Sequence, residues 1–127
     1  MHTHYSSFRP NRSHGDTAVL LVQRHIEAAF PNALSNVDLA DVAGLTLRTF
    51  LRRFDAATGY SPANYVQNLR IEKARGALER SNDSAAEISW SAGYQDISAF
   101  SRVFKSITGL TPGTYRARFR VANLRSF

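Results

Sequence analysis

Two stretches of the sequence place basic and aromatic side chains at helical spacing. In the first, Arg48 and Arg52 are four residues apart and are interleaved with Phe50 and Phe54. At about 100° per residue, Leu47, Phe50 and Phe54 fall on the inner side of such a helix and the two arginines on the outer side. An arginine can donate two hydrogen bonds to one acceptor edge, such as O6 and N7 of guanine. The spacing therefore predicts an exposed helix face that binds an anionic target.

The same arrangement returns fifty residues later. Ile97, Phe100 and Phe104 share the inner side of a second helix, and Arg102 occupies the position of Arg52. A solvated basic face explains any one of these arginines about as well as binding does. Two copies with arginine at the same outward position favour a shared anionic target.

The duplication extends beyond these two helices. The segment "TGYSPANY" at 58–65 returns as "TGLTPGTY" at 108–115, and Ala43-Gly44 returns as Ala92-Gly93 with one extra residue in the second turn. Each copy therefore reads as a short helix, a glycine turn, a second helix, a glycine stop and a Ser/Thr-Pro start to a third. This order is the helix-turn-helix pattern, in which the second helix is the recognition helix.

Apolar periodicity and capping residues predict an all-α chain of seven helices and no strand. The segments that carry these patterns, caps included, are 16–30, 35–44, 45–59, 62–80, 81–93, 96–109 and 111–119. The expected organisation is a flexible N-terminal arm, a first helix-turn-helix subdomain, a linker helix, a second helix-turn-helix subdomain and a C-terminal tail. In the same order these parts cover 1–16, 17–60, 61–80, 81–120 and 121–127.

The length of the expected linker helix suits a protein with two recognition helices. From Pro62 to Arg80 it would be roughly 28 Å long at 1.5 Å per residue. Successive major grooves on one face of DNA are about 34 Å apart. A single chain could then present two recognition helices one turn of DNA apart.

Charge and composition narrow the function classes. The chain holds 16 Lys and Arg against 10 Asp and Glu, a net charge of +6, with a pI near 10.3. That balance favours a polyanionic partner, although a solvated basic surface has the same composition. The chain contains no cysteine, which excludes disulfides and thiolate metal sites. We find no apolar run that could span a membrane and no signal peptide, so we expect a cytoplasmic, nucleoid-associated protein without a membrane partner.

The segment from Val37 to Phe119 resembles the DNA-binding domain of the AraC/XylS family of bacterial transcription regulators. Its most specific part is "GYQDISAFSRVFKSITGLTPGTYR" at 93–116. The amino-acid sequence is most similar to that of the subgroup that carries an N-terminal DJ-1/PfpI-like domain, which is absent here. The resemblance implies seven helices in two helix-turn-helix subdomains joined by a long linker helix. It also implies that an effector or dimerisation domain lies outside this chain.

The resemblance further implies that the outward face of each recognition helix reads bases in the major groove of double-stranded DNA. The expected base-reading residues are Arg48, Leu51, Arg52, Ile97, Ser98, Ser101 and Arg102. The expected phosphate-contacting residues are Thr46, Thr49, Arg53 and Lys105. Leu51 and Ile97 depart from the polar residues often found at their positions, and could touch a thymine methyl group or turn inward. Trp90 is expected to be half exposed. The resemblance also makes RNA polymerase a candidate partner.

Two other function classes compete with this interpretation. An enzyme is disfavoured because no Ser/His/Asp set, phosphate loop or carboxylate pair falls at meaningful spacing, so no catalytic residue, cofactor or metal is predicted. His2 and His4 could bind a metal ion only adventitiously. A helical protein-interaction module without DNA binding is the alternative. Binding to duplex DNA that weakens steeply with salt would separate it from a DNA-binding domain.

Overall fold

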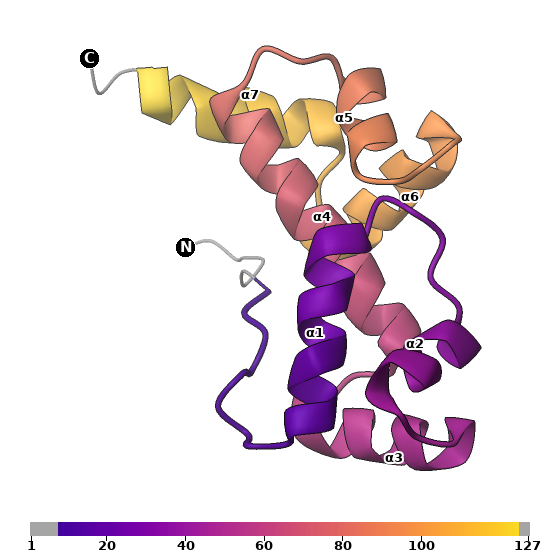
Figure 1. The fold of residues 1–127 in the computed structure, drawn as a ribbon. Coiled ribbons are helices and arrows are strands. Elements are labelled where there is room, and N and C mark those ends of the chain that lie inside the picture. Colours follow the sequence, from indigo (N-terminus) through magenta and orange to yellow (C-terminus); the bar gives the residue numbers. More distant parts are fainter. Residues whose placement is uncertain (1–7, 125–127) are drawn as a thin grey trace. The chain divides into compact units, whose positions relative to one another are not determined.

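The structure is a computed structural model that describes residues 8–124, with side chains as far as Arg120. The described part of the chain is all-α and contains seven helices, as the sequence predicts (Figure 1). They are α1 (Thr17–Ala29), α2 (Asn36–Ala43), α3 (Leu47–Thr58), α4 (Pro62–Arg80), α5 (Ala85–Ser91), α6 (Ile97–Thr108) and α7 (Pro112–Leu124).

The described residues divide into two compact units within α4, between Leu69 and Arg70. We name residues 8–69 the first subdomain and residues 70–124 the second subdomain. Each subdomain contains one copy of the sequence repeat. The helix expected as a separate linker over 61–80 contributes its first part to one core and its second part to the other. It is therefore a structural element of both subdomains.

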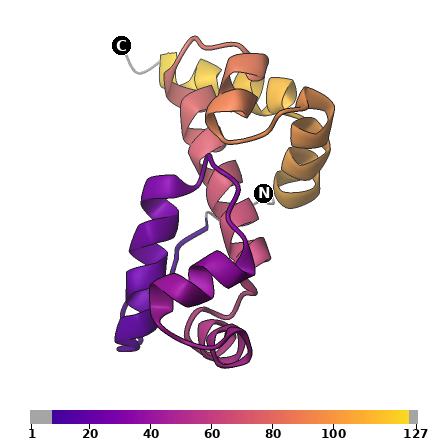
Figure 2. The same ribbon diagram turned by 45° about the vertical axis from the view of Figure 1, so that its right-hand side comes forward.

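In the first subdomain, α1, α2 and α3 pack on one another, as Figures 1 and 2 show. Phe50 and Phe54 are fully buried, and the ring of Phe54 meets that of Tyr65 edge-on at a centroid distance of 5.2 Å. The core around them comprises Phe8, Val19, Val22, Ile26, Leu39, Ala40, Tyr65, Val66 and Leu69. The three- and four-residue steps along α1 and α3 thus produce the buried stripes that the sequence predicts.

The second subdomain repeats this packing with its own residues. Phe100 and Phe104 are fully buried, and the ring of Phe104 meets that of Tyr115 edge-on at 5.5 Å. The rest of this core comprises Ile71, Ala74, Leu78, Ile88 and Ala92. The paired phenylalanines therefore set the rotation of α3 and α6 about their own axes in the same way.

The first helices of the two helix-turn-helix corners begin alike, and each is followed by a glycine of positive φ. Ser35 and Ser84 cap α2 and α5, each accepting a hydrogen bond from the backbone N–H three residues on. Gly44 ends α2 in the left-handed conformation, at a φ of 71° that favours glycine. In the second copy Gly93 also has a positive φ, of 100°. The C-caps differ, because α5 ends with Ala92 in the right-handed conformation and Gly93 follows it, which accounts for the extra residue in the second turn.

The segment before α1 differs from the arm expected over 1–16. Residues 1–7 lie outside the described part of the chain. From Phe8 onward the segment packs on the first subdomain, because the Phe8 ring is buried edge-on against Tyr60 and Tyr65, at centroid distances of 5.4 and 5.2 Å. Edge-to-face contacts with two tyrosine rings therefore hold the only aromatic side chain of this described segment.

The C-terminal end differs as well. The sequence pattern ends near Phe119, and a tail is expected over 121–127. α7 continues instead to Leu124, and residues 125–127 lie outside the described part.

Candidate nucleic-acid interface

The recognition helix of the first subdomain, α3, presents two arginines away from the core. Phe50 and Phe54 are fully buried on its inner side, so Arg48 and Arg52 are exposed on its outer side. Neither guanidinium forms an ion pair with any residue that the structure describes. Both cations are therefore available to an external ligand, as the sequence predicts.

The recognition helix of the second subdomain, α6, has the same design with a weaker charge. Ser98, Arg102 and Lys105 are exposed on the side opposite Phe100 and Phe104. Within the described residues, Arg102 and Lys105 are also without an ion pair. On both helices, cations without an ion-pair partner are exposed on the side opposite the buried phenylalanines.

Hydroxyl groups lie at the start and on the flank of α3. Thr46 is exposed and caps the helix, its Oγ1 accepting a hydrogen bond from the backbone N–H of Thr49 at 3.3 Å. Its hydroxyl hydrogen remains able to donate to an anion. The Thr49 side chain is half-buried. In the second subdomain the capping residue is Asp96, a carboxylate that can only accept.

The aliphatic residues at the border of each apolar face differ in how far they are covered. Leu51 is half-buried against the core of the first subdomain, and Ser101 at the equivalent position is half-buried as well. Leu47, expected on the inner side, is 41% exposed, and Ile97, for which an inward and a DNA-facing position were both open, is 40% exposed. Each is the first residue of its helix, where a side chain at the rim of the core is only partly covered. Leu47 was missed as a candidate contact residue, although its alignment with Ile97 could have revealed it.

Arg53, on the flank of α3, already has a partner. Its Nε and Nη2 atoms donate to Oδ2 and Oδ1 of Asp16 at 3.0 and 2.8 Å, forming a two-pronged ion pair. Asp16 also caps α1 through the backbone N–H of Val19. The hydrogen bonds from Arg53 are the largest influence that holds the pKa of Asp16 below its ordinary value, and the carboxylate raises the pKa of Arg53. Of the two charged residues among the expected phosphate contacts, Arg53 forms an ion pair within the described residues and Lys105 does not.

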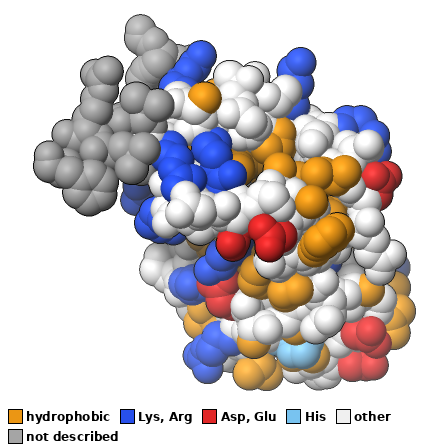
Figure 3. Space-filling view, turned by 90° about the horizontal axis from the view of Figure 1, so that it is seen from above, with side chains coloured by type: hydrophobic (Ala, Val, Ile, Leu, Met, Phe, Trp, Pro, Cys, Tyr) orange, Lys and Arg blue, Asp and Glu red, His pale blue; other side chains and the backbone are white. Residues whose placement is uncertain are grey.

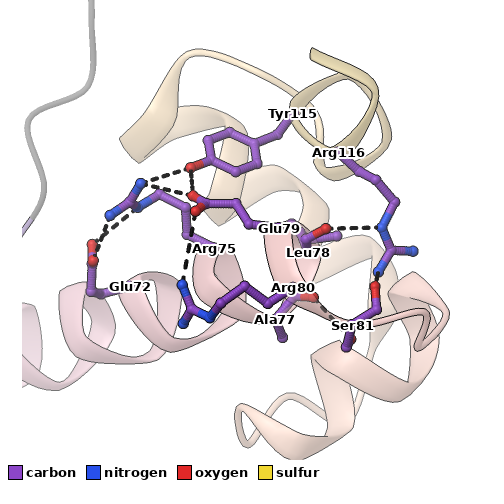
Figure 4. Close-up of polar contacts among 9 residues, drawn as sticks. All are labelled: Glu72, Arg75, Ala77, Leu78, Glu79, Arg80, Ser81, Tyr115 and Arg116. Atoms are coloured by element: carbon purple, nitrogen blue, oxygen red, sulfur yellow. Dashed lines mark hydrogen bonds and ion pairs between the residues drawn. The ribbon is translucent and has the colours of Figure 1, made fainter. Parts of the chain in front are cut away.

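Several other arginines serve the fold. Arg75 of α4 donates to both carboxylate oxygens of Glu72, to Glu79 at 3.0 Å and to the Tyr115 hydroxyl at 2.8 Å (Figure 4). Burial is the largest cause that raises the pKa of Tyr115 above its ordinary value. The strongly basic composition therefore overstates the charge available to a ligand.

Two arginines of α7 stabilise the C-terminal end of α4. Arg116 donates to the carbonyl oxygens of Leu78 and Ser81, at 3.2 and 3.1 Å (Figure 4). Arg120 donates to the carbonyl of Ser81 and to the side chain of Asn82. Charged donors at this end satisfy carbonyls that lack helical partners and complement the helix dipole.

Exposed hydrophobic side chains accompany the basic ones. The face drawn in Figure 3 carries Lys and Arg side chains, hydrophobic side chains and fewer acidic ones. Trp90 of α5 is 60% exposed, close to the half exposure that the sequence predicts. The buried Ser89 beside it donates its hydroxyl hydrogen to the Ala86 carbonyl at 2.8 Å, which satisfies it without a ligand.

Other kinds of site have no support in the described residues. No three of their His, Asp or Glu side chains are grouped so that they could hold a metal ion. His2 and His4 lie outside the described part. None of the helices described combines the length and the apolar character that crossing a membrane requires.

The fold and the exposed recognition helices define a protein with two helix-turn-helix units. Comparison with known sequences identifies the family. The helix-turn-helix domain family matches residues 39–118 of the chain. A putative AraC-like transcription regulator of Streptomyces lividans is 42% identical over 79 residues, which are 62% of this chain and 26% of that protein. The transcriptional activator NphR of a Rhodococcus species is 40% identical over 96 residues, which are 75% of this chain and 28% of that protein.

Solved structures agree with the sequence comparison. The DNA-binding domain of AdpA, a global transcriptional factor solved in complex with a target DNA, has a TM-score of 0.78 at 28% identity. The match covers 83% of this chain and 95% of that one. A transcriptional regulator from Chromobacterium violaceum with an AraC-type DNA-binding domain has a TM-score of 0.75 at 26% identity, over 80% and 91% of the two chains.

This chain belongs to the AraC-type helix-turn-helix family, which is a family of DNA-binding transcription regulators and not of enzymes. It spans between 26% and 42% of the length of the curated relatives that it matches.

Proposed function

We propose that this chain binds double-stranded DNA by inserting α3 and α6 into the major groove, each helix reading one half-site, and so regulates transcription. The observation that carries the proposal is the repeated pair of recognition helices with exposed, unpaired cations over a buried phenylalanine anchor. An exposed helix of this size fits the major groove, where arginine can pair with guanine. The similar DNA-binding domain of AdpA was solved in complex with a target DNA, which supports DNA as the ligand.

The proposed base readers follow from exposure. Arg48, Arg52 and Arg102 would donate to base edges, and Ser98 would accept or donate at a neighbouring base. Ile97 would meet a thymine methyl group, and Leu47, equally exposed at the matching position, would do the same in the first half-site. Leu51 and Ser101 would approach the bases only from the edge of the contact, because both are half-buried.

Phosphate contacts would flank these base contacts. Thr46 and Lys105 are exposed and can donate to a phosphate oxygen, and Thr49 is partly accessible on the same flank as Thr46. Arg53 would join them only after leaving Asp16.

Simultaneous engagement of both recognition helices would make one chain equivalent to a dimer. The 19 residues of α4 would span roughly 28 Å at 1.5 Å per residue. That length suits two half-sites about 10 base pairs apart on one face of the duplex. Selection of bound duplexes from a random pool tests this directly. We expect two conserved segments at one fixed spacing, and a single segment would show that only one recognition helix reads the sequence.

The complete regulator would contain more than this chain. The share of its relatives that the chain spans supports an effector or dimerisation domain elsewhere, with the protein acting in the cytoplasm at the nucleoid. RNA polymerase would be a second partner, and the exposed Trp90 supports a protein contact on the second subdomain. If the chain were a protein-interaction module alone, it would not bind duplex DNA in a salt-dependent way.

A further inference from the structure

The ion pair between Asp16 and Arg53 connects two parts of the first subdomain that are 37 residues apart in sequence. Arg53 lies on the recognition helix, directly after the proposed base reader Arg52. Asp16 lies at the N-terminus of α1, where its carboxylate accepts from both the arginine and the backbone N–H of Val19. The Arg53 side chain is 36% exposed and that of Asp16 only 19%, so the carboxylate is the more firmly enclosed partner.

The position of Asp16 is itself fixed by the segment that precedes α1. Its backbone N–H donates to Nδ1 of His14 at 3.0 Å, and His14 Nε2 lies 2.8 Å from the buried Gln23. Asp16 is therefore held through its backbone by His14 and through its carboxylate by the Val19 N–H, and these contacts remain when Arg53 is attracted elsewhere. A DNA phosphate must therefore compete with a pre-formed, two-pronged partner for Arg53.

We propose that Asp16 withholds Arg53 from the DNA backbone and so limits the affinity of the first subdomain for any duplex. The inference rests on the proposed function, since it presumes that α3 faces DNA. Arg48 and Arg52 are unpaired and remain free to read bases. The effect of the pair is to leave the base-reading arginines available while removing one sequence-independent contact. Because phosphate contacts carry no sequence information, the pair should lower affinity for specific and random duplexes alike.

The substitution Asp16→Asn tests the proposal with little disturbance of the fold. Asparagine caps helices as well as aspartate does, so α1 should keep its N-cap while the negative charge is lost. We expect random duplex to bind more tightly. The slope of log affinity against log salt should steepen by about 0.9, the value for one added phosphate contact. The gain in affinity over the wild type should shrink by a factor of about 3.5 between 50 and 200 mM salt, as that slope requires.

Two further variants separate release of Arg53 from a general gain of positive charge. Asp83→Asn makes the same chemical change at an exposed position in the second subdomain and should leave the salt slope unchanged. Arg53→Gln in the wild-type background should change affinity for random duplex by less than about twofold, because the arginine is already withheld. In the Asp16→Asn background it should abolish the whole gain, which is a coupling that a double-mutant cycle measures.

The outcomes distinguish this proposal from the proposed function. A wild-type chain that does not bind duplex DNA refutes the proposed function, and this inference with it. If the wild type binds but Asp16→Asn leaves affinity and slope unchanged, only this inference is wrong. It is also wrong if Arg53→Gln alone lowers the slope by about 0.9, since Arg53 would then already contact phosphate. Thermal unfolding of each variant confirms that the comparison is made between folded chains.

Discussion

The two subdomains share one packing plan but satisfy their equivalent buried tyrosines by different chemistry. In the first, the Tyr65 hydroxyl accepts from Nε2 of the fully buried Gln23 at 3.0 Å, so its partner is an uncharged amide. In the second, the Tyr115 hydroxyl lies between Arg75 and Glu79, in a charged network. The two tyrosine rings pack in the same way, whereas the hydrogen-bond partners of their hydroxyl groups differ.

The contrast teaches which features a duplicated fold keeps. Ring packing depends on shape and volume, and the phenylalanines and tyrosines have been retained at matching positions. A buried hydroxyl requires only some hydrogen-bond partner, and either an amide or an ion pair meets that requirement. The surfaces diverge further: α3 offers two unpaired arginines and α6 one arginine and one lysine.

The largest effect should come from the shared aromatic anchor. Phe54→Ala and Phe104→Ala should each lower the free energy of unfolding of their own subdomain by about 3–5 kcal/mol, because each leaves a cavity in a closed core. Chemical denaturation measures this, and Trp90, the only tryptophan, reports on the second subdomain. An alanine variant with full stability would show that the helix is rotated differently from the structure.

The next effect concerns the unpaired arginines. Arg52→Ala and Arg102→Ala should each weaken binding to a selected site by about 1–3 kcal/mol and relax the base preference of one half-site only. Gel shift on the selected site and on half-site variants separates the two. Arg118, an exposed arginine on α7, provides the matched control through Arg118→Ala. Equal losses on specific and random duplex would mean that Arg52 and Arg102 contact only phosphate.

The difference between the tyrosines should be smaller but measurable. Tyr65→Phe leaves one N–H of the fully buried Gln23 without an acceptor, which costs about 1–3 kcal/mol. Tyr115→Phe should cost less than about 1 kcal/mol, since Arg75 and Glu79 still pair with each other and both reach solvent. Denaturant midpoints of the two variants measure this. Equal costs would show that the amide partner and the charged network stabilise their tyrosines equally.

The smallest effect should appear at the exposed aliphatic positions. Replacing a contacted thymine by uracil removes one methyl group and should weaken wild-type binding by about 0.8 kcal/mol. Leu47→Ala should remove this sensitivity in the first half-site, and Ile97→Ala in the second. Leu21→Ala serves as the control and should retain it, because Leu21 is an exposed aliphatic residue of α1, outside the recognition helices. Sensitivity that survives Leu47→Ala would exclude a methyl contact by Leu47.

Much of the fold could be predicted because its signals are local. The Ser84-x-x-Glu87 capping box, the proline at the start of α4 and the phenylalanine spacing each act within a turn or two of helix. The C-terminal extent of α7 was not predictable in this way. Its first turns carry a clear pattern, whereas the continuation to Leu124 has no stop signal or apolar period.

The candidate site was predictable in part for the same reason. Exposure of Arg48, Arg52 and Arg102 follows from the burial of phenylalanines two positions away on the same helices. The solvent exposure of Leu47 and Leu51 could not be predicted from the sequence, because both lie on the border of the apolar face. Which of them is covered depends on the neighbouring helices and not on the helix itself.

The sequence by itself determined the seven helices, their caps, the duplication and the outward arginines, since all of these depend on residues within a few positions of one another. Only the tertiary structure decided that Phe8 is packed, that Arg116 caps α4 and that Asp16 holds Arg53. Each of these contacts joins residues at least 37 positions apart or on different elements. Many arginines and many carboxylates could pair in principle, and only the folded chain selects the partners by bringing particular atoms within hydrogen-bond distance.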